Sequence, residues 1–200
     1  MEDSFYGDSI IYLEGAIDNM LAKIEIIRKY TKMQGEDDPI SYIVSRVKTE
    51  ESMKEKLKRR GFEVTLENAL TKVYDAVGIR IICPYIQDVY TVAEMIKKCR
   101  GVSTFQEKDY IKNPKPNGYR SFHLIISLNL DIAGYEKPVY VEIQLRTIAM
   151  DFWSSLEHEI KYKKNIKNTE IIVKELKSCA DLIATTDLNM QTIKNMINQD

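Results

Sequence analysis

The sequence VEIQLRT at residues 141–147 predicts a β-strand around which the other elements of this chain are arranged. Its odd-numbered positions are apolar up to Leu145, as expected for the face that packs on a core. The opposite face carries three polar side chains in a row: Glu142, Gln144 and Arg146. A carboxylate, an amide and a guanidinium in this order suit a metal or phosphate site. On spacing alone, an ordinary solvated face also fits.

The composition indicates one compact domain, residues 1–200, which we expect to be catalytic. With 200 residues, of which 44% are hydrophobic and 30% charged, the chain is long enough to bury a core. It has no apolar run of the roughly 18 residues that a membrane span needs, and no basic-then-apolar signal at its start. A net charge of −1 argues against bulk electrostatic binding of DNA. We therefore expect a cytoplasmic protein without membrane or DNA partners.

The cysteines favour neither a disulfide framework nor a zinc site. Cys83, Cys99 and Cys179 are odd in number and lack CxxC or Cys/His spacing. We expect them to be buried thiols.

Long amphipathic helices are predicted at both ends of the chain, at residues 1–34 and 166–200, on either side of a core at 40–165. Each carries an apolar stripe with alternate spacings of three and four residues. The stripe of the last helix is Ile172, Leu176, Cys179, Ile183, Thr186, Met190, Ile193 and Ile197. These stripes fit a subunit interface, and they equally fit packing within one chain.

A cationic segment at residues 45–61 begins with a short extended piece and continues as a helix that Thr49 caps and Gly61 ends. Most of its lysines and arginines suit a solvated helix face. Arg46 and Lys48 instead project from one face of the extended piece, which is where a phosphate clamp would be built.

The sequence VYDAVGIRIICPY, residues 73–85, predicts a second strand with an acidic residue just before it. Asp75 precedes the β-rich run and Arg80 lies on one of its faces. Such an acid often only caps a turn. The helix predicted after this strand gives an α/β alternation.

The segment DYIKNPKPNGYRSFHLII, residues 109–126, begins with a loop that combines rigidity, cations and an aromatic ring. Pro114 and Pro116 stiffen it, and Asn117 and Gly118 form a turn before Tyr119. Lysines and an arginine nearby suit a nucleotide, with the ring stacked on a base and the cations at its phosphates. A plain hairpin-like connection with a half-buried tyrosine explains the same residues. His123, in the strand that follows, is by itself more typical of a structural histidine.

Four segments in this order resemble the synthetase domain of the RelA/SpoT family: DAVGIR, NPKPNGYRSFH, VEIQLRT and AMDFWSSLEH. The length is similar to that of its single-domain members, the small alarmone synthetases. The resemblance implies an α+β fold in which a mixed β-sheet is flanked by helices, similar to nucleotidyltransferases. It also implies a homo-oligomer, with a tetramer as the first expectation.

The resemblance implies a GTP pyrophosphokinase, which transfers the β,γ-diphosphate of ATP to the ribose 3′-hydroxyl of GDP or GTP. The products are AMP and (p)ppGpp, the alarmone of the stringent response. Such a transfer needs Mg²⁺ to gather charge and a base near the hydroxyl. Hydrolysis of the product is not expected, because His123 and His158 are the only histidines and no aspartate follows either.

The matching positions imply that Asp75 and Glu142 are the catalytic residues and hold Mg²⁺, with Glu142 also a candidate to activate the hydroxyl. The implied ATP-binding positions are Arg46, Lys48, Ser52, Lys56, Arg80 and Lys108. Lys108 stands where many members have an arginine that stacks on adenine, and a lysine lacks that planar group. The implied acceptor positions are Lys115, Asn117, Tyr119 and His123. Gln144 and Arg146 would order the strand and the outer shell of the ion.

Two alternatives from other classes are a catalytically inactive guanine-nucleotide sensor and a single-stranded RNA-binding protein. A sensor would not need the paired acids. The sequence offers Tyr119 and lysine clusters for RNA, but no second stacking aromatic in a basic groove.

Overall fold

The computed structural model describes residues 4–162 and 169–197. The elements in chain order are α1 (Ser9–Met33), β1 (Tyr42–Val47), α2 (Glu50–Arg59), α3 (Leu66–Thr71), β2 (Val77–Cys83), α4 (Ile86–Lys97), β3 (Val102–Asp109), β4 (Phe122–Ile132), β5 (Tyr135–Thr147), α5 (Ile148–Tyr162) and α6 (Thr169–Ile197). The strands form one sheet in the order β1-β2-β5-β4-β3, in which β2 and β5 are parallel and the other neighbours antiparallel. This mixed sheet with flanking helices confirms the predicted α+β fold.

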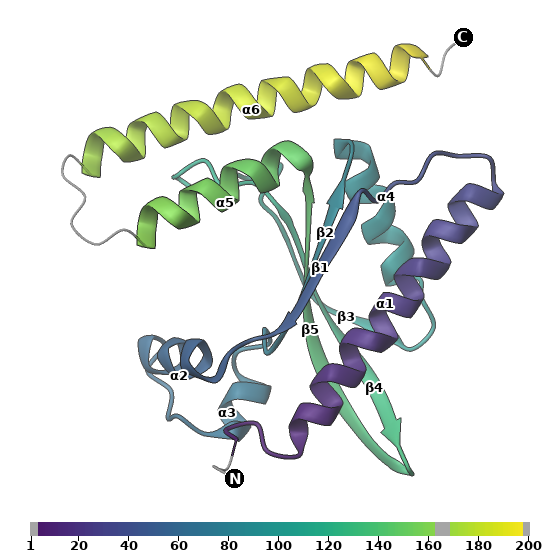
Figure 1. Ribbon diagram of the computed structural model, residues 1–200, viewed down its shortest axis with the longest axis vertical. Helices are drawn as coiled ribbons and strands as arrows, with labels where there is room; N and C mark the ends of the chain where they lie inside the picture. Colours follow the sequence, from purple (N-terminus) through teal and green to yellow (C-terminus); the bar gives the residue numbers. More distant parts are fainter. Residues whose placement is uncertain (1–3, 163–168, 198–200) are drawn as a thin grey trace.

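Strand β5 separates the core from the polar face, as its alternation predicts. Val141, Ile143 and Leu145 are fully buried. They belong to a core that also contains the buried sides of α1 and α4. Figure 1 shows α1 and α4 on one side of the sheet, and α2 and α5 on the other. The even-numbered side chains of β5 therefore point away from the core.

Two rows of partners cross the sheet and bring the polar residues together. One row runs from Arg46 through Gly78, Glu142 and Ile125 to Gln106. The row beside it contains Val44, Arg80, Gln144, His123 and Lys108. Residues that lie up to about a hundred positions apart in sequence thus share one face, because the parallel pairing of β2 with β5 fixes their register.

Local capping explains the two short helices that follow β1. The side chain of Thr49 accepts a hydrogen bond from the backbone of Ser52, and Thr65 does the same for Asn68. Gly61, at φ +74°, follows α2 in the left-handed region that favours glycine. The predicted start of α2 at Thr49 and its end at Gly61 are confirmed, and Thr65 begins the next helix as its sequence predicts.

Helix α6 returns along α5 and extends past it over α4 (Figure 1). Along its described length, Ala180 and Asp187 are the buried residues. The members of the predicted stripe differ in exposure. Ile172, Leu176 and Ile183 are half-buried, whereas its remaining members, from Cys179 to Ile197, are exposed. The expected boundary between the core and this helix, at residues 165 and 166, lies outside the described residues.

Two expectations from composition can be compared with the structure. Cys83 is buried and Cys99 half-buried, but Cys179 is exposed on α6, so the prediction of three buried thiols is wrong for Cys179. None of the helices in the described ranges has the length and apolar character to cross a membrane.

Candidate active site

Asp75 lies at the entrance of β2 and is held between two lysines. Its Oδ2 accepts hydrogen bonds from Lys48 Nζ, at 2.8 Å, and from Lys56 Nζ. These side chains are 10%, 19% and 17% exposed, so the ion pairs are largely screened from solvent. Burial, helped by the charges of Lys48 and Arg60, lowers the pKa of Lys56 although the Asp75 carboxylate acts to raise it. The other oxygen, Oδ1, is buried and has no hydrogen-bond partner in the described part of the chain.

Glu142, on the adjacent strand β5, is a partly buried carboxylate with neighbours on both oxygens. Gln144 Nε2 donates to Oε2 at 2.9 Å, and His123 Nδ1 lies 3.4 Å from Oε1. Burial alone would raise the pKa of Glu142. The hydrogen bonds from His123 and Gln144, together with the charges of His123 and Lys56, outweigh burial and lower this pKa to about 2. The carboxylate therefore stays ionised at any physiological pH.

Two cavities open on the polar face, and Glu142 lines both. The first, of about 280 Å³, contains Arg46, Lys48, Asp75 and Arg80. Gly78 lies in its floor between Arg46 and Glu142, and a Cβ built on it would meet no atom closer than 4.0 Å. This glycine leaves open the space that a side chain would fill.

The second cavity, of about 210 Å³, lies on the other side of Glu142. Its cations are Lys56, Arg60, Lys108 and Lys115, and its rings are Tyr110 and His123. Lys115 Nζ lies 4.7 Å from the centre of the Tyr110 ring and 4.8 Å from that of Tyr119. Lys56 and Lys108 therefore lie with Lys115 and His123, and not in the cavity that contains Arg46, Lys48 and Arg80.

Hydrogen bonds link the predicted site residues into a closed ring. Gln144 donates to Glu142. Arg146 Nη2 donates to Gln144 Oε1 at 2.9 Å and to the Tyr119 hydroxyl at 2.8 Å. That hydroxyl lies 2.7 Å from His123 Nε2, and His123 closes the ring at Glu142. Arg146 is 4% exposed and so acts as an internal clamp. The ring connects the aromatic side of the site to the carboxylate.

Two predicted positions have local structural partners. Asn117 Nδ2 donates to Glu157 on α5 at 2.9 Å, and its Oδ1 accepts from the backbone of Tyr119 at 3.2 Å. Ser52 lies exposed in the first turn of α2, where its hydroxyl accepts a hydrogen bond from Thr49. Ser52 lines neither of the two cavities.

Sequence reasoning missed Asp151 and Tyr110. Asp151, in the first turn of α5, binds Arg146 at 3.1 Å and Arg80 at 3.2 Å, and accepts a hydrogen bond from Tyr42. Acidic residues are common in the first turn of a helix, so Asp151 gives no specific signal of a site. Its position shortly after Arg146 in the sequence was the one available indication. Tyr110 supplies a second aromatic ring among lysines, which corrects the expectation that none would be present.

The donor set at Asp75 and Glu142 fits Mg²⁺. This ion binds through one or two carboxylates and completes its shell with waters and substrate phosphates. Asp75 Oδ1 is a buried oxygen without a partner, as a ligand position requires, and both carboxylates line the first cavity. The described residues contain no cluster of three or more acidic, histidine or cysteine ligands, so this site would depend on substrate oxygens.

Known proteins match this chain along almost its whole length. The model "Region found in RelA / SpoT proteins" matches residues 45–167. GTP pyrophosphokinase YwaC of Bacillus subtilis is 40% identical, over 99% of this chain and 93% of the relative. The crystal structure of small alarmone synthetase 1 of Bacillus subtilis, bound to its product pppGpp, is also similar. It superimposes with a TM-score of 0.85 at 30% identity, over 96% of this chain and 97% of that one. Small alarmone synthetase 2 of the same organism gives 0.84 at 39% identity, over 94% and 97%.

Proposed function

Because this chain belongs to the RelA/SpoT family, we propose that it is a GTP pyrophosphokinase that makes (p)ppGpp from ATP and GDP or GTP. The observation that carries the proposal is the position of Glu142 between two cationic cavities, one of which also contains Asp75. A transfer between two nucleotides needs two adjoining sites that share the catalytic group.

The cavity with Arg46, Lys48 and Arg80 suits the triphosphate of ATP. Arg80 is held by Asp151 at 3.2 Å, while its Nε is buried without a partner in the described residues. A guanidinium fixed in this way presents donors to phosphate oxygens at little further entropic cost. Lys48, bound to Asp75, keeps positive charge beside the position of the transferred diphosphate.

Mg²⁺ would be held by Asp75 and Glu142, and when bound it would gather charge from the diphosphate. Without the ion, Asp75 is balanced by Lys48 and Lys56. Two cations on Oδ2 leave Oδ1 available. When the ion is bound, Lys48 and Lys56 would remain near the phosphates and balance the negative charge of the transferred diphosphate.

The cavity with Tyr110, Lys115 and His123 suits the guanine nucleotide. We place the base on Tyr119, with Lys115 and His123 near the phosphates. The 3′-hydroxyl would approach the ionised Glu142 and donate a hydrogen bond to it as the oxygen attacks the β-phosphorus of ATP. The bond from the β-phosphorus to the oxygen of the α-phosphate then breaks, and AMP leaves. The proton of the hydroxyl would pass to the Glu142 carboxylate and from there to water.

The alternative as an RNA-binding protein has less support from the geometry. The rings of Tyr110 and Tyr119 are inclined at 67°, with centres 6.0 Å apart. They therefore do not form a continuous platform on which successive bases could stack. The inactive-sensor alternative is disfavoured by the two carboxylates in one cavity.

We also propose that the chain forms a homo-oligomer through α6. Leu182, Leu188 and Met196 are 67%, 60% and 62% exposed on this helix. Large apolar side chains left exposed along one long helix are typical of a protein interface. A tetramer is the first expectation from the family resemblance.

The reaction can be tested with the purified protein, ATP, Mg²⁺ and GDP, followed by chromatography of the nucleotides. We expect equal amounts of AMP and ppGpp, and neither when GDP or Mg²⁺ is omitted. Binding of both nucleotides without any product would instead support the sensor alternative.

A further inference from the structure

Tyr74, the residue before Asp75, has an unusual backbone conformation. Its φ is +56°, in the left-handed region that residues with a bulky side chain rarely adopt. Among the described non-glycine residues, only Ala133 also has a positive φ. Ala133 lies in the tight β4–β5 turn, where such values are normal. Tyr74 lies in no hairpin, so surrounding contacts must hold it in this conformation.

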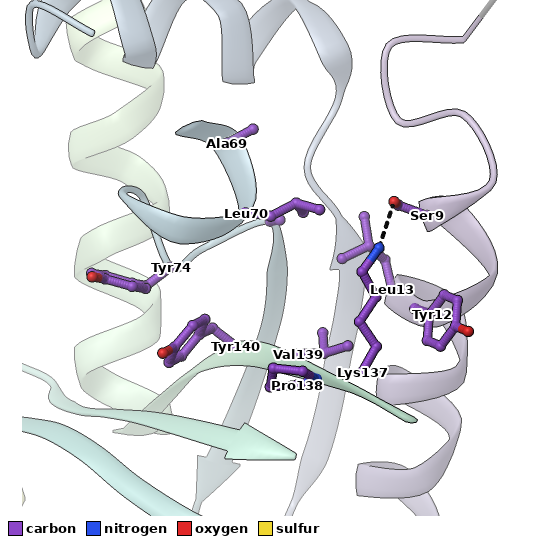
Figure 2. A pocket seen from close by; sticks show the side chains of 11 residues that line it. Ser9, Tyr12, Leu13, Ala69, Leu70, Tyr74, Lys137, Pro138, Val139 and Tyr140 are labelled. Atoms are coloured by element: carbon purple, nitrogen blue, oxygen red, sulfur yellow. Dashed lines mark hydrogen bonds between the residues drawn. The ribbon is translucent and has the colours of Figure 1, made fainter. Parts of the chain in front are cut away.

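Two aromatic rings, those of Tyr140 and Phe105, provide such contacts. The Tyr74 ring lies 4.7 Å from that of Tyr140 and 4.8 Å from that of Phe105, and the last two are 5.1 Å apart. Figure 2 shows Tyr74 and Tyr140 side by side at one end of a pocket, one on the segment after α3 and the other on β5. Tilted ring pairs at these distances are favourable.

The third ring is placed by an irregularity in β3. The pairing of β3 with β4 shifts register between Thr104 and Gln106, which leaves Phe105 as the extra residue. Such bulges redirect a side chain and often lie beside active sites. Here the bulge turns Phe105 toward Tyr74 and Tyr140, although half of its surface remains exposed.

The cluster of Tyr74, Phe105 and Tyr140 connects the two carboxylates of the site. Tyr74 directly precedes Asp75, and Tyr140 lies two residues before Glu142 on the same face of β5. The contact between the two rings therefore joins the segment that carries Asp75 to the strand that carries Glu142, next to the point where β2 and β5 pair.

We propose that Tyr74 is a positioning residue, whose left-handed backbone, clamped by Phe105 and Tyr140, directs Asp75 toward the metal position. This inference rests on the proposed function, in which Asp75 and Glu142 hold the divalent ion. If the backbone relaxed to negative φ, the Asp75 carboxylate would turn away from Glu142 while the sheet stayed intact.

The test compares Tyr74→Gly with Tyr74→Ala. Both remove the ring, but glycine adopts positive φ freely and alanine does not. Affinity for Mn²⁺ is measured in the presence of a non-hydrolysable ATP analogue, from the electron paramagnetic resonance signal of the free ion, so no turnover is needed. We expect the glycine variant to bind Mn²⁺ about tenfold more tightly than the alanine variant, and less tightly than wild type. Equal Mn²⁺ affinities of the alanine and glycine variants would overturn the proposal. A tyrosine that only packs would give this result, because both variants lose the ring.

A second pair keeps the test decisive if the alanine variant does not fold. Asparagine tolerates positive φ, whereas leucine does not but is apolar. We expect Tyr74→Asn to bind Mn²⁺ more tightly than Tyr74→Leu, and the reverse order would contradict the proposal. Phe105→Ala should also weaken Mn²⁺ binding. Tyr135→Ala, which removes a ring that is 75% exposed on β5, should leave it unchanged.

The metal site and the positioning role of Tyr74 can be tested separately. If Asp75→Asn retains full Mn²⁺ affinity and synthesis, the proposed metal site is wrong. If Asp75→Asn loses both while the Tyr74 variants equal wild type, only the positioning role is wrong.

Discussion

The hydroxyl of Tyr119 lies 2.7 Å from Nε2 of His123, so the proposed guanine platform is tied to the ring of hydrogen bonds that reaches Glu142. From the sequence alone, Tyr119→Phe should be silent, because the ring face remains. The structure revises that expectation, since phenylalanine would remove one hydrogen-bond partner from both His123 and Arg146. We expect Tyr119→Phe to lower kcat, because the lost hydrogen bonds raise the activation free energy by about 1 kcal/mol. KM for ATP should change little.

Tyr119→Ala should weaken use of the acceptor more strongly. Loss of one base-stacking ring costs about 1–3 kcal/mol, which would appear in KM for GDP and not in KM for ATP. The two Michaelis constants and the melting temperature should be measured together. An equal loss for both substrates with a lower melting temperature would show that Tyr119 only packs.

Asp75→Asn and Glu142→Gln should each abolish synthesis with the fold retained. Each removes a charge that meets the proposed ion, and loss of such a preorganised contact lowers the rate by roughly 10²- to 10³-fold. Glu136→Gln is the matched control, because Glu136 is an exposed acid on the same strand as Glu142. Turnover within a few-fold of wild type in either variant would remove that residue from the site.

Stability at low pH should depend on Glu142. Its pKa in the folded protein, about 2, is below the ordinary value of 4.5, so its stabilising contribution is complete above pH 4.5 and disappears as pH falls toward 2. Between pH 6 and pH 3 we expect wild type to lose about 2 kcal/mol more free energy of unfolding than Glu142→Gln, by urea titration. Identical pH dependence in both proteins would show that Glu142 is not held in this way.

Gly118→Ala should disturb the contact between the acceptor loop and α6. Gly118 has φ +90°, and a Cβ there would lie 2.5 Å from Cβ of Ala180. We expect a lower melting temperature and a higher KM for GDP. Adding Ala180→Gly should restore part of both, because it relieves the clash but not the backbone strain. No rescue at all would mean that the loop does not rest on α6 in solution.

Leu182→Glu should dissociate the proposed oligomer. A buried charge at a subunit interface is strongly unfavourable. Lys174→Gln, at an exposed position of α6, lowers the net charge by the same one unit and serves as the control. Light scattering at micromolar concentration measures both. A monomer mass for wild type, or unchanged assembly in Leu182→Glu, would contradict the role of α6.

The sheet could be predicted because its signals are local. Alternation in VEIQLRT separates core from site, and Thr49 and Thr65 cap helices through contacts within three residues. The family motifs then identified Asp75 and Glu142 as a pair. Their place in one cavity follows from the parallel pairing of β2 and β5, which alternation alone does not specify.

The missed features depend on contacts between distant segments. Asp151 gains its role only when α5 is set beside β2, and the left-handed Tyr74 is stabilised by rings from β3 and β5. Lys56 and Lys108 were grouped with Arg46 by motif, but the fold puts them across Glu142 in the second cavity. No pattern in a single segment contains that information.

The most direct test of the central claim, diphosphate transfer at the junction of the two cavities, follows the label of ATP in one reaction. With GDP and Mg²⁺ present, label from the γ-phosphate should pass into the guanine product, while label from the α-phosphate should appear in AMP in equal amount. Asp75→Asn should do neither, while its circular dichroism spectrum shows that the fold is retained. Release of labelled inorganic phosphate or pyrophosphate without a labelled guanine nucleotide would contradict the account.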